Sequence, residues 1–126
     1  MNSERYQNGW RNLSSIDGES GTKVIEGLKD IAPDLGRYII EFTFGDIYSR
    51  GNLSLKEREM ITISSLTTQG GCEDQLKVHI NAALNVGVEP AQITETIIQC
   101  IPYVGFPRVI NAINVTKKVF QERSLI

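Results

Sequence analysis

Residues 54–87 read SLKEREMITISSLTTQGGCEDQLKVHINAALNVG, and this stretch decides the fold class. It opens on Ser54-Leu55-Lys56-Glu57, a capping box whose serine hydroxyl and glutamate carboxylate can satisfy free backbone amides of a first helical turn. The helix that starts there is expected to run to about Thr68, because Gly70-Gly71 ends the apolar periodicity.

A second helix is expected directly afterwards, from about Glu73 to Asn85. Gly87 stands where a C-cap glycine belongs, since glycine adopts the left-handed conformation without a steric penalty. Two helices joined by a short glycine turn predict an all-α architecture.

The rest of the chain shows the same helical spacing and no strong strand pattern. Six or so helices in 126 residues predict one helical bundle that forms a single domain over residues 1–126. Residues 1–21 are expected to hold an N-terminal helix over 3–14 and a polar loop over 14–21. A helix capped by Thr22 is expected next, and then a longer helix after Ala32-Pro33-Asp34. The inward side chains expected on the longer helix are Leu35, Tyr38, Ile39 and Phe42, with Phe44 and Ile47 further along. The last two expected elements are a helix from Pro90 to Val104 that Pro102 interrupts late and a helix after Gly105-Phe106-Pro107.

The composition excludes several classes of function. The net charge of -2 offers no basic excess for nucleic acid or an anionic membrane. No apolar run approaches the roughly 20 residues that span a bilayer, and the N-terminus lacks a signal-peptide core, so a cytoplasmic location is expected. Cys72 and Cys100 form no CxxC pair, and with a single histidine no metal site is expected. The isoleucine-rich stripe of residues 93–104 exceeds what so small a chain buries alone, which predicts an oligomer.

Glu59 projects from an apolar helical face. In a helix that begins at Leu55, the side chains of Glu59, Ile63 and Leu66 share that face. A carboxylate there loses hydration unless a partner compensates. The pattern fits either a functional carboxylate or a structural ion pair.

His79 is the only histidine, and it can give or take a proton near neutral pH. Gln75 precedes it by one turn on the same face, and Cys72 stands near the helix N-terminus, where the backbone dipole favours a thiolate. The spacing of three and four residues allows all three to face one cavity. The alternatives are a core histidine bonded to a backbone carbonyl and a small cysteine at a helix junction.

Several segments in order resemble the carboxymuconolactone decarboxylase family. Leu53–Ile63 is similar to the start of the family domain, and Gln75–Gly87 is similar to its next helix. The decarboxylase-like branch has a segment similar to Phe44–Tyr48. The resemblance covers roughly residues 30–120, which we take as the domain core. The C-terminal part of the chain is similar to the family's closing motif, through Gln99, Tyr103, Gly105 and Pro107, followed by Asn111-Ala112.

The resemblance implies an alkyl hydroperoxidase D-like bundle of about six helices that assembles into a ring, as a homohexamer or trimer. One branch of the family decarboxylates 4-carboxymuconolactone in aromatic catabolism, with no metal or organic cofactor. The other branch reduces peroxides with a Cys-x-x-Cys pair, a histidine one turn later and a glutamate on the preceding helix.

Carried over residue by residue, Glu59 matches the glutamate, Cys72 the first cysteine and His79 the histidine. Gln75 stands at the second cysteine position, so the internal disulfide of the peroxidase branch cannot form. Glutamine there resembles the decarboxylase branch.

Our leading hypothesis is therefore a lyase that removes carbon dioxide from a small carboxylated lactone or similar acidic substrate. His79 would deliver the proton and Glu59 would orient it, while Gln75 would donate to a substrate oxygen. Tyr103 and Arg50 are the other expected substrate-binding residues.

Two alternatives remain open. One is a thiol-dependent peroxide reductase in which Cys72 attacks the peroxide with an external thiol as the reductant. The other is an oligomeric binding protein without catalytic activity. Arg58 and Arg108 are further candidates to bind a substrate carboxylate.

Overall fold

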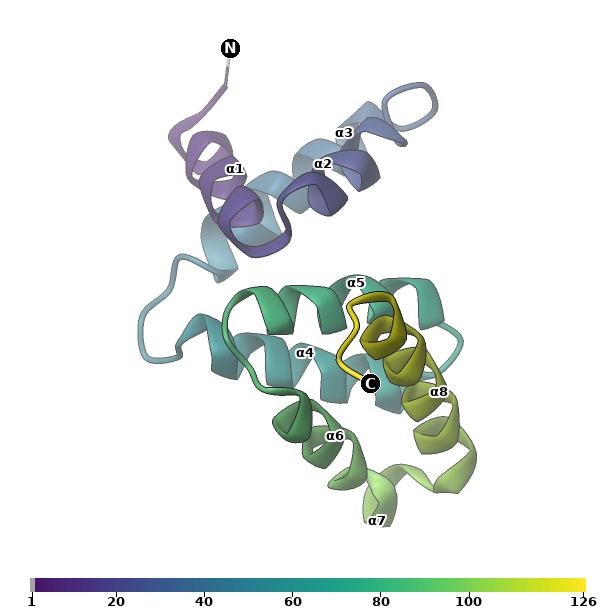
Figure 1. Ribbon diagram of the computed structural model, residues 1–126. Coiled ribbons are helices and arrows are strands. Elements are labelled where there is room, and N and C mark those ends of the chain that lie inside the picture. The colour runs from purple at the N-terminus through teal and green to yellow at the C-terminus, as the bar shows by residue number, and fades with distance from the viewer. Residues whose placement is uncertain (1) are drawn as a thin grey trace. The chain divides into compact units, whose positions relative to one another are not determined.

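The computed structural model describes residues 2–126, and over that range it confirms the all-α prediction, with no strand. Its internal contacts divide the chain into two compact units, Met1–Ser54 and Leu55–Ile126. Each unit is a set of short helices (Figure 1). The single domain over residues 1–126 stays a prediction.

The first unit holds α1 (Glu4–Asp17), α2 (Glu19–Glu26), α3 (Pro33–Tyr38) and the π-helix η1 (Ile39–Ile47). Ser3 caps α1, because its hydroxyl accepts a hydrogen bond from the Tyr6 amide at 3.1 Å. The wide turn of η1 shows in the bond from the Tyr48 amide to the Thr43 carbonyl, five residues back, at 2.9 Å.

Glycines bring α1 and η1 into backbone contact. A methyl group on Gly9 would lie 2.0 Å from the Ile40 carbonyl oxygen, and one on Gly45 would lie 2.4 Å from the Arg5 carbonyl oxygen. Both distances are far below any real contact, so this crossing requires the absence of a side chain at both positions.

The loop expected over residues 14–21 is wrong. Helix α1 continues to Asp17, and α2 begins at Glu19 after a single residue with positive φ, Gly18. Leu13 and Ile16 are buried one turn apart, and this burial outweighs the polar composition of the segment. Thr22 is also no cap, because it lies inside α2.

The inner face of α3 and η1 also differs from the prediction. Phe44 is buried as expected, but it belongs to a row spaced by four with Gly36 and Ile40, which are also buried. The expected inward side chains of Leu35, Tyr38 and Phe42 are about half exposed. The cause is Gly36, which a count of apolar side chains ignores. Its lack of a side chain lets this row pack closely against Ile25.

The second unit holds α4 (Leu55–Gln69), α5 (Glu73–Asn85), α6 (Pro90–Ile98), α7 (Ile101–Val104) and α8 (Phe106–Glu122). The bounds of α4 and α5 confirm the prediction. Gly70 and Gly71 between them and Gly87 after α5 all have positive φ. Pro90 opens α6 as expected.

The one helix expected from Pro90 to Val104 is instead two. Helix α6 ends at Ile98, and Pro102 lies in the first turn of the separate α7. Proline lacks an amide hydrogen and clashes with the carbonyl four residues back, so it suits a helix start better than a helix interior.

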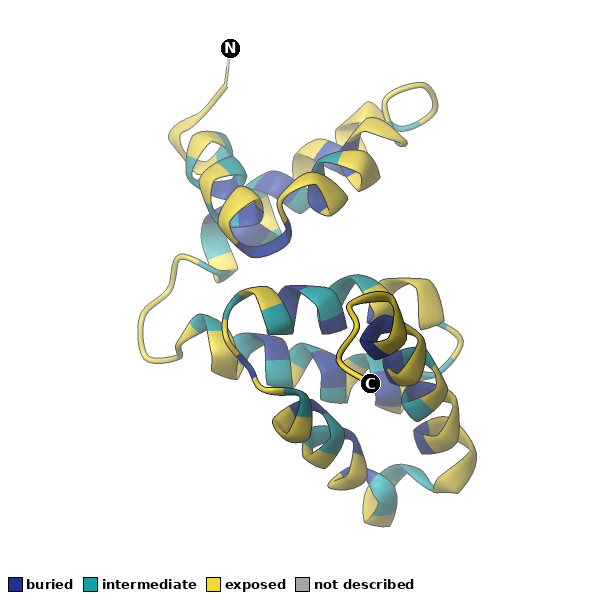
Figure 2. Cartoon of the chain, viewed as in Figure 1, coloured by how far each residue is buried: buried dark blue, intermediate teal, exposed yellow. Residues whose placement is uncertain are grey.

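The core of the second unit is aliphatic. Its buried side chains lie on the inward faces of α4, α5, α6 and α8 (Figure 2). No helix formed by residues 2–126 combines the length and the apolar content needed to cross a membrane. The core includes Ile63, Leu76, Ile80, Ile93, Ile97, Val109 and Phe120.

Candidate active site

Glu59 and His79 form a hydrogen-bonded pair between α4 and α5. The ring nitrogen Nδ1 of His79 lies 2.8 Å from Oε1 of Glu59. Because α4 and α5 are joined by a short turn, they are adjacent antiparallel helices, which puts the middle of one beside the middle of the other. The glycine turn of the sequence therefore builds this pair.

Local periodicity places each partner. Glu59, Ile63 and Thr67 form a row spaced by four on α4, and all three are buried. This row packs on α5, where Leu76 and Ile80 are buried on either side of His79 in the sequence. The predicted position of Glu59 on an apolar face is confirmed.

The two partners differ in exposure. The Glu59 side chain is 0% exposed, whereas the His79 side chain is 20% exposed. A carboxylate removed from water needs hydrogen-bond donors to remain ionised, and His79 supplies one. The imidazole is therefore hydrogen-bonded on its buried side and accessible to solvent on its other side.

This hydrogen bond fixes the chemistry of the ring. With Glu59 ionised, Nδ1 carries the hydrogen and donates it to Oε1, so the neutral ring has its lone pair at Nε2. Nε2 has no hydrogen-bond partner among residues 2–126. A small molecule that reaches this atom would meet a group able to accept or deliver one proton.

The other expected site residues are not hydrogen-bonded to this pair. Gln75 is exposed one turn before His79 on α5, and Tyr103 on α7 is 82% exposed. Neither side chain makes a hydrogen bond within residues 2–126. Arg50 is exposed in the first unit, after η1.

Cys72 stands apart from the pair. It precedes His79 by seven residues, which is two turns or about 10 Å along the helix. Its Sγ lies 3.2 Å from the Leu66 carbonyl oxygen, to which the thiol donates. The thiol of Cys100 donates to the Thr96 carbonyl of its own helix at 3.4 Å, and neither cysteine forms a disulfide.

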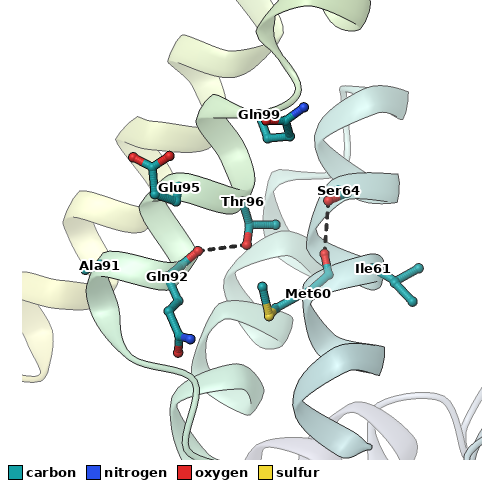
Figure 3. A pocket seen from close by; sticks show the side chains of 8 residues that line it. All are labelled: Met60, Ile61, Ser64, Ala91, Gln92, Glu95, Thr96 and Gln99. Atoms are coloured by element: carbon teal, nitrogen blue, oxygen red, sulfur yellow. Dashed lines mark hydrogen bonds between the residues drawn. The ribbon is translucent and has the colours of Figure 1, made fainter. Parts of the chain in front are cut away.

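A groove in the second unit lies between α4 and α6, and it contains none of the expected site residues (Figure 3). It has a volume of about 540 Å³, and Glu95 is its only charged lining residue. The hydroxyls of Ser64 and Thr96 donate to carbonyls of their own helices, so they offer little to a ligand. Nowhere in residues 2–126 do three His, Cys, Asp or Glu side chains meet in a way that could hold a metal ion.

Thr67 was not predicted from the sequence, although its side chain is buried and lines the same small cavity as Cys72. The signal was present, because Thr67 continues the spacing of four that links Glu59 to Ile63. A threonine late in a helix nevertheless resembles an ordinary polar surface residue, so the sequence alone does not distinguish it.

The second unit is all-helical, and its buried glutamate is hydrogen-bonded to a partly exposed histidine on the adjacent helix. These features place the chain among small α-helical proteins with an acid–histidine pair. The model of the carboxymuconolactone decarboxylase family matches residues 33–118. The chain belongs to this family, which confirms the predicted resemblance.

Three relatives show how the family resemblance extends. The chain is 32% identical to 4-carboxymuconolactone decarboxylase of Acinetobacter baylyi, over 97% of this chain and 92% of the relative. It is 29% identical to an uncharacterised 15.0 kDa protein of Paracoccus denitrificans, over 78% of this chain and 74% of the relative. It is 30% identical to a nitrosuccinic acid decarboxylase of Metarhizium robertsii, over 67% of this chain and 58% of the relative.

Proposed function

We propose that this protein decarboxylates a small carboxylic acid and that His79 moves the proton. The observation that carries the proposal is the 2.8 Å hydrogen bond between His79 and the wholly buried Glu59. Two relatives that bear the name of decarboxylases support the reaction class.

The reaction needs an electron acceptor in the substrate. When the bond between the carboxylate and its neighbouring carbon breaks, carbon dioxide leaves and the electron pair stays on that carbon. The names of the two decarboxylases specify a lactone acid and a nitro acid, and both a lactone and a nitro group withdraw electrons. We therefore propose a substrate of the 4-carboxymuconolactone type, in which the electron pair left by carbon dioxide delocalises onto such a group.

His79 then completes the reaction. Its protonated Nε2 delivers a proton to the carbon that lost the carboxylate, and Glu59 keeps the ring in one orientation throughout. Because Glu59 is held inside the unit, the ring does not have to be ordered when the substrate arrives, which lowers the entropic cost of the step.

Substrate binding falls to exposed groups. Gln75 offers an amide one turn from His79, and Tyr103 offers an exposed hydroxyl. Arg50 offers a guanidinium that can bind a carboxylate through two parallel hydrogen bonds. We keep all three as proposed substrate-binding residues.

The predicted ring, a homohexamer or trimer, remains part of the proposal. Phe106 and Ile110 on α8 are 64% and 54% exposed, and Ile98 on α6 is 41% exposed. Apolar surface of this kind supports an interface between subunits. Sedimentation of the purified chain would measure the number of subunits.

The test is release of carbon dioxide from 4-carboxymuconolactone by the purified chain. We expect turnover that falls by about 10²–10⁴ in His79→Ala, the usual contribution of a general acid or base. Cys72→Ser is the matched control and should keep its turnover, because the Cys72 thiol makes no hydrogen bond to the pair. Full turnover in His79→Ala would refute the proposed role of His79.

The thiol peroxidase alternative has less support. The Cys72 thiol donates to the Leu66 carbonyl and makes no hydrogen bond to His79, and Gln75 stands where that mechanism has its second cysteine. Peroxide turnover with a dithiol reductant that disappears in Cys72→Ser would favour it over the decarboxylase.

A further inference from the structure

A small cavity lies in the second unit where the end of α4, the start of α5 and the start of α8 meet. Its lining includes Thr67, Cys72, Glu73, Arg108 and Asn111. The cavity has a volume of about 10 Å³, which is the space of about one water molecule. Its occupant can therefore be no larger than a water molecule or an ion of a single atom.

The hydroxyl of Thr67 indicates that the cavity has an occupant. Thr67 is 2% exposed, and its Oγ1 has no hydrogen-bond partner among residues 2–126. Buried hydroxyls nearly always have a partner, because an unpaired one loses its hydration without compensation. Thr67 can therefore donate a hydrogen bond to an occupant of the cavity that it lines.

Thr67 differs in this respect from the other threonines of the second unit. Each of the others donates its hydroxyl hydrogen to the carbonyl four residues back in its own helix, which is the usual bond of a helical threonine. These residues are Thr62, Thr68, Thr94, Thr96 and Thr116. The Thr67 hydroxyl makes no such bond, so it is available to a ligand.

Hydrogen-bond donors outnumber free acceptors around the cavity. It lies at the N-terminus of α5, a helix of 13 residues, where the backbone dipole favours negative charge. The backbone amides of Cys72 and Glu73 make no hydrogen bond within the described residues. The nearby Leu66 carbonyl oxygen already accepts from the Gly70 amide at 3.1 Å and from the Cys72 thiol at 3.2 Å, which uses both of its lone pairs. A water molecule has two hydrogens to donate, so these surroundings suit an anion better.

Arg108 adds a full positive charge to these donors. Its side chain lies across Gly70, where an added methyl group would be 2.9 Å from Nε. Arg108 makes no hydrogen bond or ion pair with residues 2–126, so no carboxylate of the described chain neutralises it. The Glu73 carboxylate in the lining opposes a negative occupant, but Glu73 is exposed and water and salt screen its charge.

We propose that this cavity is a binding site for one halide ion, with chloride as its ligand. The ion accepts a hydrogen bond from the Thr67 hydroxyl and lies near the Arg108 guanidinium at the N-terminus of α5. Because these groups come from α4, α5 and α8, the bound ion links the three helices and stabilises the folded second unit.

The size of the cavity makes the site selective. A carboxylate, a sulfate or a phosphate has several heavy atoms, and a volume of about 10 Å³ does not hold them. Chloride and bromide each carry one negative charge on one atom, and they are only slightly larger than a water molecule. The site is therefore distinct from the place where an acidic substrate would bind.

Halide binding is independent of the proposed decarboxylation. The cavity residues make no hydrogen bond to His79 or Glu59, and the effect of chloride on stability is measured without any substrate. An inactive decarboxylase can still bind chloride, and an active one can fail to bind it.

The test is the melting temperature of the full chain in increasing sodium chloride. Sodium gluconate, whose anion is too large for the cavity, keeps the ionic strength constant. A ligand that binds only the folded state raises stability with the logarithm of its concentration, so we expect a rise of about 4–8 °C for each tenfold increase in chloride above its dissociation constant. Bromide should replace chloride. A melting temperature that does not respond to either halide would overturn the proposal.

Crystals of the full chain grown in sodium bromide test the position of the ion without any variant. We expect the anomalous signal of bromine in the cavity, within hydrogen-bond distance of Thr67 Oγ1. Bromide bound only elsewhere on the surface would be an adventitious ion only, and it would overturn the proposal even if the melting temperature responds to halide.

Two adjacent threonines provide a matched comparison. Thr67→Val keeps the shape of the side chain and removes its hydroxyl, and we expect chloride to bind at least about tenfold more weakly, the usual effect of a lost hydrogen bond to a charged group. Thr68→Val should respond to chloride as the parent does, since the Thr68 hydroxyl is exposed and already donates to the Ser64 carbonyl at 2.8 Å. The same chloride dependence in both variants would contradict the role of Thr67.

Arg108→Gln tests the contribution of the positive charge. The side chain of Arg108 is exposed, so the replacement leaves the core of the second unit intact. We expect a dissociation constant for chloride that is at least about tenfold higher than in the parent. An unchanged dissociation constant would contradict the role of Arg108.

Discussion

Replacing His79 with leucine separates the structural role of the acid–histidine pair from its chemical role. Glu59 is completely buried, so His79→Leu leaves its carboxylate without the hydrogen bond from Nδ1. Loss of one partner of a buried ion pair costs about 3–5 kcal/mol. Because the His79 side chain is 20% exposed, we expect a value at the low end, about 3 kcal/mol.

The measurement is urea denaturation of the full chain followed by circular dichroism, at pH 7. A loss of about 3 kcal/mol corresponds to a melting temperature lower by roughly 10 °C for a domain of this size. The double variant Glu59→Leu/His79→Leu replaces both partners by apolar groups and should recover most of the stability, while it stays inactive. A stable His79→Leu variant, or a double variant no more stable than the single one, would refute the reasoning that a buried charge is being held.

Three further predictions concern packing and charge. Gly9→Ala should destabilise the first unit by more than about 2 kcal/mol in a thermal melt, because the added methyl group would collide with the Ile40 carbonyl. Gly51→Ala is the control and should be neutral in the same melt, because there is open space around Gly51. The Arg5 guanidinium donates a hydrogen bond to Asp46 and lowers the pKa of that carboxyl. The pair therefore stabilises the fold fully when the pH is above the pKa that Asp46 has in the unfolded chain. This contribution is lost as the pH falls through the lower pKa of the folded state. Asp46→Asn should therefore be less stable than the parent at pH 7 and match it in strong acid, and a stability difference that does not change with pH would contradict the assignment. Ile80→Ala removes a side chain that is 0% exposed and should cost about 2–5 kcal/mol in denaturant melts, so a loss below 1 kcal/mol would show that the core is not packed as described.

The sequence predicted best what depends on neighbouring residues. The bounds of α4 and α5 were predicted from a capping-box sequence, two glycines and a C-cap glycine, all of which act within a few positions. Glu59 was found because a spacing of four on a regular helix is enough to place a side chain on an apolar face. Its partner His79 was expected from the family resemblance, and the antiparallel packing of the two helices brought them together.

The sequence predicted poorly what depends on distant residues. The crossing at Gly9 and Gly45 depends on two glycines 36 positions apart, and nothing local distinguishes them from glycines in loops. The cavity at Cys72 needs Thr67 from α4 and Arg108 from α8, which only tertiary packing brings together. The inward face of α3 and η1 depends on the close packing that Gly36 allows, which a count of apolar side chains does not register, so Leu35, Tyr38 and Phe42 were wrongly expected inward.

The wide turn of η1 makes the burial of its side chains depend on the number of residues in the segment more than on their chemistry. A π turn contains about one residue more than an α turn, so η1 can present Phe44 and Gly45, consecutive residues, to the same buried side. Phe44 fills volume while Gly45 leaves the neighbouring backbone room to approach. Removal of one residue between Ile40 and Phe44 would rewind the segment toward an ordinary α-helix and rotate every later side chain by about a quarter turn. The first unit is therefore more sensitive to an insertion or deletion in η1 than to a conservative replacement there.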